Sequence, residues 1–232
     1  MRTVLISLVV LALALVAGDR VAVVLAQNEI GRRIATEYTL SPEPEVSIGG
    51  FPFLTQAAEG RYPDVDIRVG DWTDQNISVR DLEVALRDVT APLTDLLGGR
   101  TDTMVAATAT ATARVPYETV RDYAPEGVET IAEGPDGLRV TGTFSIEGIP
   151  VPATVVVSVA PIEDGIAVTP VSVQRAGGGG PTISLALLRG ALTFTVPLRQ
   201  LPMGARLTAI TPGPQGLLVT AVANQVHFSD LP

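Results

Sequence analysis

The side chains that most often perform chemistry are sparse in this sequence. The chain of 232 residues contains no cysteine and one histidine, His227. Thiol nucleophiles and thiolate metal sites are therefore excluded, and the usual zinc sites lack their imidazole ligands. His227 lies in a segment of alternating polarity near the C-terminus, and the chain has no Gly-x-Ser-x-Gly turn to carry a hydrolase serine. We therefore expect no catalytic triad and no metal centre.

Acidic and glycine-rich segments offer two further candidates for a chemical site. Asp64 and Asp66 alternate with apolar residues, which places both on the polar face of a strand, and the spacing to Asp71 and Asp74 does not fit an EF-hand loop. The glycine run at 177–180 lacks the following Lys and Ser or Thr of a phosphate-binding loop. The sequence predicts a protein that is not an enzyme and uses no cofactor.

Composition and charge restrict the fold and the partners. Apolar residues make up 46% of the chain but aromatic residues only 4%, so the core must consist of aliphatic and alanine side chains, which suit a pleated sheet. The net charge of −9 argues against nucleic acid as a partner, because such binding requires a basic surface. It also opposes docking on an anionic membrane by bulk attraction. Membrane association would have to come from apolar insertion or from a local arginine cluster.

The N-terminus carries a localisation signal. Val4 to Ala17 form a run of fourteen residues without a charge, which fits the core of a signal peptide (about 7–15 residues) better than a membrane span (about 20). Small residues at Gly18 and Ala26 offer two cleavage positions, and a retained anchor remains an alternative. We predict that residues 1–18 are a signal peptide or N-terminal membrane anchor. The protein would then be exported to the periplasmic side of the cell envelope.

A helix of about twenty residues is expected from Asp19 onward, in a single domain that covers residues 19–232. Asp19 is a suitable N-terminal cap, and apolar residues that include Val23, Ile30 and Ile34 recur at helical spacing. The prolines at Pro42 and Pro44 end this amphipathic helix.

The remainder of the chain alternates with period two, which is typical of half-buried antiparallel strands. A change of parity after Val79 predicts a β-bulge near Arg80 and Asp81. Prolines at first-turn positions predict short helices. The pattern indicates an α+β fold with a long, curved antiparallel sheet. The expected strands are 65–69, 77–86, 105–115, 138–146, 154–159, 166–173 with a break at Pro170, 191–196, 205–210 and 217–228; the expected short helices are 52–59, 92–97, 116–123 and 181–188.

The strand at 105–115 has alanine at every second position on one face: Ala107, Ala109, Ala111 and Ala113. A row of methyl groups leaves space above a sheet unless another element packs very close. The 19–38 helix could fill that space. Alternatively, this face is the wall of a groove for an acyl chain, because an apolar cavity favours an apolar guest.

A glycine-aromatic turn carries a family resemblance. Residues 44–56 read Pro-Glu-Val-Ser-Ile-Gly-Gly-Phe-Pro-Phe-Leu-Thr-Gln, which groups Phe51, Phe53 and Leu54 at one turn. Together with residues 65–67 (Val-Asp-Ile) and the run Leu-Pro-Met-Gly-Ala-Arg-Leu at 201–207, this stretch resembles the LmeA family (lipomannan elongation factor A) of actinobacterial phospholipid-binding envelope proteins. The resemblance spans nearly the whole chain.

The resemblance implies a lipid-binding tube akin to the TULIP and BPI proteins, with a bent sheet wrapped on the N-terminal helix. It also implies a role in the elongation of envelope mannan or lipomannan, with phospholipid, the membrane surface and proteins of envelope glycan biosynthesis as partners. The alternative is a structural or scaffolding envelope protein that contacts a glycosyltransferase or polymer and holds no lipid. The lipid-binding residues that we expect are Ile30, Ile34, Ile48, Phe51, Pro52, Phe53, Leu54, Ala107, Ala109, Ala111 and Ala113.

Overall fold

The protein is an α+β chain whose contacts gather in two compact units, each described separately below. The structure is a computed structural model that describes residues 1–74, 77–92, 94–95, 103–134, 137–146, 149–163, 165–175, 193–197 and 201–230. Unit 1 comprises Met1–Gly70, Glu83–Ala111 and Ala223–Pro232, and unit 2 comprises Asp71–Leu82 and Thr112–Val222. The assignment of residues 19–232 to one domain stays a prediction; within that range the chain packs around two centres.

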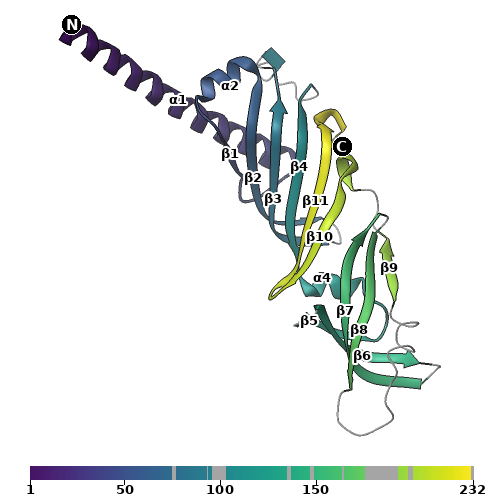
Figure 1. Ribbon diagram of the computed structural model, residues 1–232. Coiled ribbons are helices and arrows are strands. Elements are labelled where there is room, and N and C mark those ends of the chain that lie inside the picture. Colours follow the sequence, from purple (N-terminus) through teal and green to yellow (C-terminus); the bar gives the residue numbers. More distant parts are fainter. Residues whose placement is uncertain are drawn as a thin grey trace. The chain divides into compact units, whose positions relative to one another are not determined.

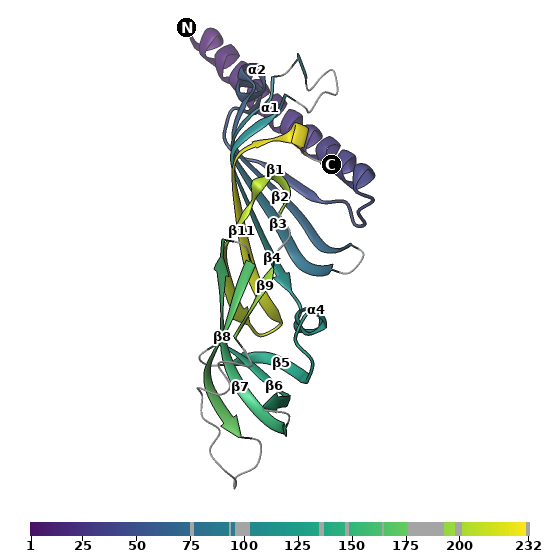
Figure 2. The ribbon, with the colours of Figure 1, turned by 90° about the vertical axis from the view of Figure 1, so that its right-hand side faces the viewer.

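Unit 1 begins with one long helix, α1, at Arg2–Glu37. The expected boundary at Asp19 is absent: the apolar segment and the amphipathic helix are continuous, and the N-cap of α1 is Met1. Residues 1–18 are exposed throughout, whereas Asp19, Val23, Gly31 and Ala35 are buried. The second half of α1 lies along one face of the unit 1 strands (Figure 1, Figure 2).

The two sheets are antiparallel, with six and five strands. The first has the order β1-β2-β3-β4-β11-β10, and β1 pairs with β2 from Glu45↔Arg68 to Ile48↔Val65. The second has the order β5-β6-β7-β8-β9. The strands are β1 Glu45–Ile48, β2 Arg61–Asp74, β3 Ile77–Thr90, β4 Val105–Val115, β5 Val128–Gly134, β6 Gly137–Ile146, β7 Ile149–Ile162, β8 Gly165–Arg175, β9 Phe194–Pro197, β10 Arg206–Gly213 and β11 Gly216–His227.

The predicted bulge in β3 is confirmed, because Asp81 has a φ of 51° inside the strand. The predicted break at Pro170 is a bulge as well. In the pairing of β7 with β8, Val156 faces Ser172 and Val157 faces Pro170, so Val171 is the extra residue and the strand continues.

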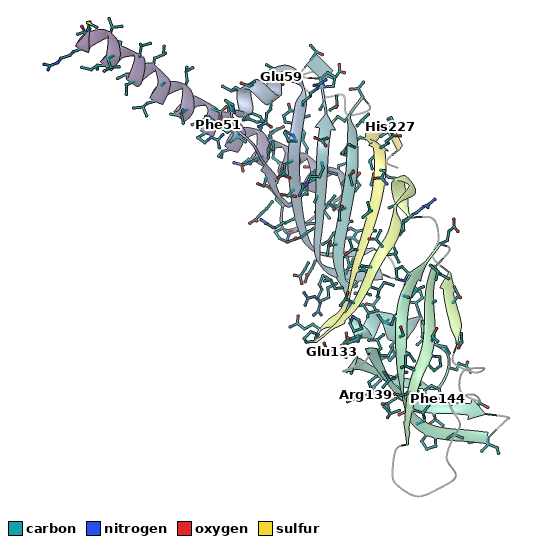
Figure 3. The ribbon with its side chains drawn as sticks, viewed as in Figure 1. Phe51, Glu59, Glu133, Arg139, Phe144 and His227 are labelled. Carbon is teal, nitrogen blue, oxygen red and sulfur yellow. The ribbon has the colours of Figure 1, made fainter. Side chains whose placement is uncertain are left out.

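Unit 2 has its core where β6 and β7 meet β11. Leu138, Phe144, Val155 and Leu217 are buried together there, and Phe144 is labelled in Figure 3. The short helix α4 (Tyr117–Asp122) begins after Pro116, as predicted, and the Tyr117 hydroxyl donates a hydrogen bond to the Gly213 carbonyl at 2.7 Å.

The remaining short elements match the proline signals where the structure describes them. Helix α2 (Phe53–Glu59) follows Pro52, and Gly60 ends it in the left-handed region with a φ of 65°. Two 3-10 turns, η1 (Pro202–Gly204) and η2 (Phe228–Asp230), complete the chain. The helix expected at 181–188, the glycine run at 177–180 and most of the helix expected at 92–97 lie outside the described residues.

Candidate functional site

The most specific contact in unit 1 joins α1 to the start of α2. The Asp19 carboxylate is buried, with 2% of its surface exposed, and its Oδ1 accepts a hydrogen bond from the backbone amide of Leu54 at 2.8 Å. Leu54 is in the first turn of α2, where backbone amides have no partner within the helix. The sequence predicted that Asp19 caps its own helix, which is wrong. It caps α2 instead, because α1 runs through residue 19 without a break.

Hydrogen-bond donors surround the Asp19 carboxylate: the amides of Leu54 and Phe53 and the guanidinium of Arg20. Arg20 Nη2 lies 2.6 Å from Asp19 Oδ2. The acidic residue that interrupts the apolar sequence is thus neutralised inside the corner between α1 and α2.

The aromatic turn divides into an inward and an outward part. Phe53 is 7% exposed and packs on Tyr62, with 6.3 Å between the ring centroids. Phe51 and Leu54 are 59% and 49% exposed, and the Arg20 guanidinium lies 4.9 Å from the centre of the Phe51 ring. Figure 3 shows Phe51 against α1, close to where the helix leaves the rest of unit 1. Gly50 supports this path with a φ of 85°.

The inner face of the unit 1 sheet carries small and aliphatic side chains. Three neighbouring strands each bury two residues that are three positions apart: Leu86 and Val89 in β3, Ala106 and Ala109 in β4, and Ala223 and Val226 in β11. In β3 and β11 a residue with positive φ, Asp88 or Gln225, lies in that interval. The positive φ values mark a change of side-chain parity in β3 and β11, and β4 buries residues at the same spacing, which a simple alternating pattern does not predict.

The burial of the alanines in β4 differs from the alternating alanine face that the sequence predicted. Ala106 is fully buried and Ala109 is 6% exposed, but Ala107 is exposed and Ala111 is half-buried. Ala113 is buried in unit 2. Since Ala106 and Ala109 are covered by protein in this structure, close packing describes their surroundings better than an open groove.

The helix side of the same region is also closely packed. A side chain on Gly31 would place its Cβ 2.6 Å from the carbonyl oxygen of Pro44, so only glycine allows α1 to approach the start of β1 this closely. Ile48 is buried, Ile34 is half-buried and Ile30 is exposed. Ile30 therefore lies off the buried face of α1, although the helical spacing had grouped it with Val23.

Two surface hollows are polar and lie away from the expected lipid residues. A hollow of about 380 Å³ in unit 1 is bordered by Gln27, Asn28, Glu43 and Arg68, among others. Another, of about 400 Å³ in unit 2, is bordered by Asp71, Arg80 and Glu118. Neither of these two hollows is lined by a residue from the expected lipid site.

The candidate catalytic side chains are two aspartates that pair with an arginine and one exposed histidine. Arg87 forms ion pairs with Asp64 and with Asp66, at 3.0 Å from Asp66 Oδ1, which places both carboxylates on the polar face of β2 as predicted. His227 is exposed at the end of β11. These two carboxylates share one guanidinium on the surface of the sheet.

Sequence reasoning missed Asp19 as a contact between helices, and it missed Leu86, Val89, Ala106, Ala223 and Val226 as residues of the inner face. A charge inside an otherwise apolar helical segment was the available signal for Asp19. For the inner face, the sequence contains the apolar pairs at a spacing of three. Their burial could not be predicted from alternation alone, because it depends on bulges in the strands.

Comparison with known proteins gives one result. A family model described as LmeA-like phospholipid-binding matches residues 17–222. No curated protein and no solved structure matches the chain.

Proposed function

This chain belongs to the LmeA-like phospholipid-binding family, and we propose that it holds a phospholipid on the inner face of unit 1, between α1 and the sheet. Phospholipid binding follows from the family. The location rests on one observation: three adjacent strands bury aliphatic and alanine side chains at the same spacing of three, with Ile48 and Phe53 buried in the same unit. Such side chains leave room for an acyl chain once α1 separates from them.

The further role we propose is support of envelope mannan or lipomannan elongation, by holding or shuttling lipid. It rests on the resemblance of the Gly-Phe-Pro-Phe-Leu turn to the LmeA family. The second candidate is a scaffolding role without lipid. It is favoured by the full burial of Ala106 and the near-full burial of Ala109, which leave the inner face closed.

Native mass spectrometry of the full chain, extracted under mild conditions, separates these two functions. We expect one phospholipid per chain that persists as collision energy rises, after loosely bound detergent and annular lipid have left. A clean mass of the lipid-free chain from several preparations would support the scaffold instead.

We propose export to the periplasmic side of the envelope, with α1 as the signal. Helix α1 is long and apolar enough to cross a membrane by length and composition, a test that a signal sequence also passes. Cleavage after Ala26 would remove the buried residues Asp19 and Val23, whereas cleavage after Gly18 would keep both. The contacts of α2 with Asp19 therefore favour either cleavage after Gly18 or retention of α1.

A fusion of residues 1–40 to a reporter that is active only outside the cytoplasm tests export, and the intact mass of the envelope form identifies its N-terminus. Equal activity from a cytoplasmic reporter would overturn export.

A further inference from the structure

The exposed apolar surface of α1 does not end at the charged pair that interrupts its sequence. Val21, Val24 and Leu25 are exposed beyond Asp19 and Arg20. Asp19 is turned onto α2, so the acidic group is removed from the surface of the helix. On the side of α1 that α2 covers, Phe51 and Leu54 supply exposed apolar side chains in its place.

These five residues form what we call the collar: Val21, Val24, Leu25, Phe51 and Leu54. Arg20 is the charged side chain within the collar, half-exposed, paired with Asp19 and stacked on Phe51. A guanidinium with an aromatic ring beneath it and a long aliphatic stem can stay at the level of lipid phosphates while its neighbours are buried in apolar surroundings. Beyond the collar α1 becomes polar, with Glu29 bound to Arg32 and Arg33.

The lengths of the apolar segments of α1 can be compared with the thickness of the layers of a bilayer. The fourteen-residue run Val4 to Ala17 spans about 21 Å at about 1.5 Å per residue, short of a hydrocarbon core of about 30 Å. Arg20 to Leu25 adds about 9 Å, which is comparable to the depth of about 5–10 Å that interfacial helices reach. The apolar run therefore accounts for most of a hydrocarbon core, and the collar has the axial extent of an interfacial layer.

We propose that the collar is seated in the interfacial layer of a phospholipid bilayer, continuous with the apolar N-terminal half of α1, with Arg20 among the lipid phosphates. This inference rests on the phospholipid-binding function and on the retention of α1 proposed above, and it assigns the surface that meets the bilayer. With a net charge of −9, apolar insertion and not bulk attraction must hold the chain at the membrane. The corner between α1 and α2 thus fixes unit 1 at a set depth beside its lipid source.

The full chain in phosphatidylcholine nanodiscs tests this, with tryptophan as a depth probe. Trp72 is the sole tryptophan, so Trp72→Phe gives a dark background. On that background Phe51→Trp places the probe in the collar. The control is Tyr38→Trp, which places it at an exposed position at the other end of α1. Lipids brominated near the headgroup should quench the Phe51→Trp variant at least about two-fold more than the Tyr38→Trp variant.

Equal, weak quenching of both variants would overturn the proposal. Leu54→Trp repeats the measurement if the Phe51→Trp variant does not fold. The same variants in detergent with brominated lipid, without a bilayer, report any quenching by bound cargo. If quenching in detergent matches the value in nanodiscs, the signal comes from phospholipid bound inside the protein. That result would also overturn the proposal for the collar. Native mass spectrometry of the wild-type chain measures lipid binding independently of these variants. A failure of the collar proposal can therefore be distinguished from a failure of the lipid-binding proposal.

Discussion

The carboxylate of Asp19 accepts a hydrogen bond from the backbone amide of Leu54, at 2.8 Å and 35 residues further along the chain. This contact positions the aromatic turn against α1. It also hides the charge that divides the apolar N-terminus from the rest of the helix.

Replacement of Asp19 by Ala should lower the melting temperature of the full chain in detergent, because the first turn of α2 loses its cap and Arg20 loses its partner. Asp19→Asn should lower it less, since the amide oxygen can still accept from Leu54. The measurement is thermal unfolding followed by circular dichroism. Equal melting temperatures for the wild type and Asp19→Ala would contradict the capping role.

Substitution of Gly31 should destabilise the protein, whereas substitution of Gly18, in the same helix, should not. A Cβ at position 31 would lie 2.6 Å from the Pro44 carbonyl oxygen, whereas nothing lies within 4 Å of a Cβ at position 18. We expect Gly31→Ala to cost about 1–3 kcal/mol of unfolding free energy through overpacking. Gly18→Ala should be neutral or gain up to about 1 kcal/mol from helix propensity. Equal effects of the two substitutions in denaturant unfolding would show that the approach of α1 to β1 is not tight.

Ala109 and Ala107 offer a matched pair on β4, one buried and one exposed. Ala109→Leu should lower the stability of the lipid-free chain by about 1–3 kcal/mol, because the added atoms meet a packed face. It should also reduce phospholipid occupancy, because leucine takes volume from the proposed lipid site. Ala107→Leu should change neither. Stability and occupancy are measured on delipidated and lipid-loaded protein. Lost stability with unchanged occupancy for Ala109→Leu would remove this strand from the lipid site.

Local sequence signals predicted much of the fold. The period-two alternation located most of the described strands but missed β1 and β5, and the prolines at 52 and 116 located α2 and α4. The parity change after Val79 located the bulge at Asp81. Each of these features depends on residues that are adjacent in the chain, so the sequence carries them directly. The Gly-Phe-Pro-Phe-Leu turn likewise indicated the family, which the match of the family model to residues 17–222 confirms.

Only the tertiary structure decided where Asp19 points and which alanines are buried. Asp19 has the residue type of a helix cap, but the amide that it binds belongs to another helix, and helical periodicity does not identify a partner 35 residues away. Ala106 is buried instead of Ala107 because the burial of β4 is set by its neighbours in the sheet, β3 and β11, both of which change parity. The sequence thus determined the elements and the family, while the long-range contacts determined which side chains those elements turn inward.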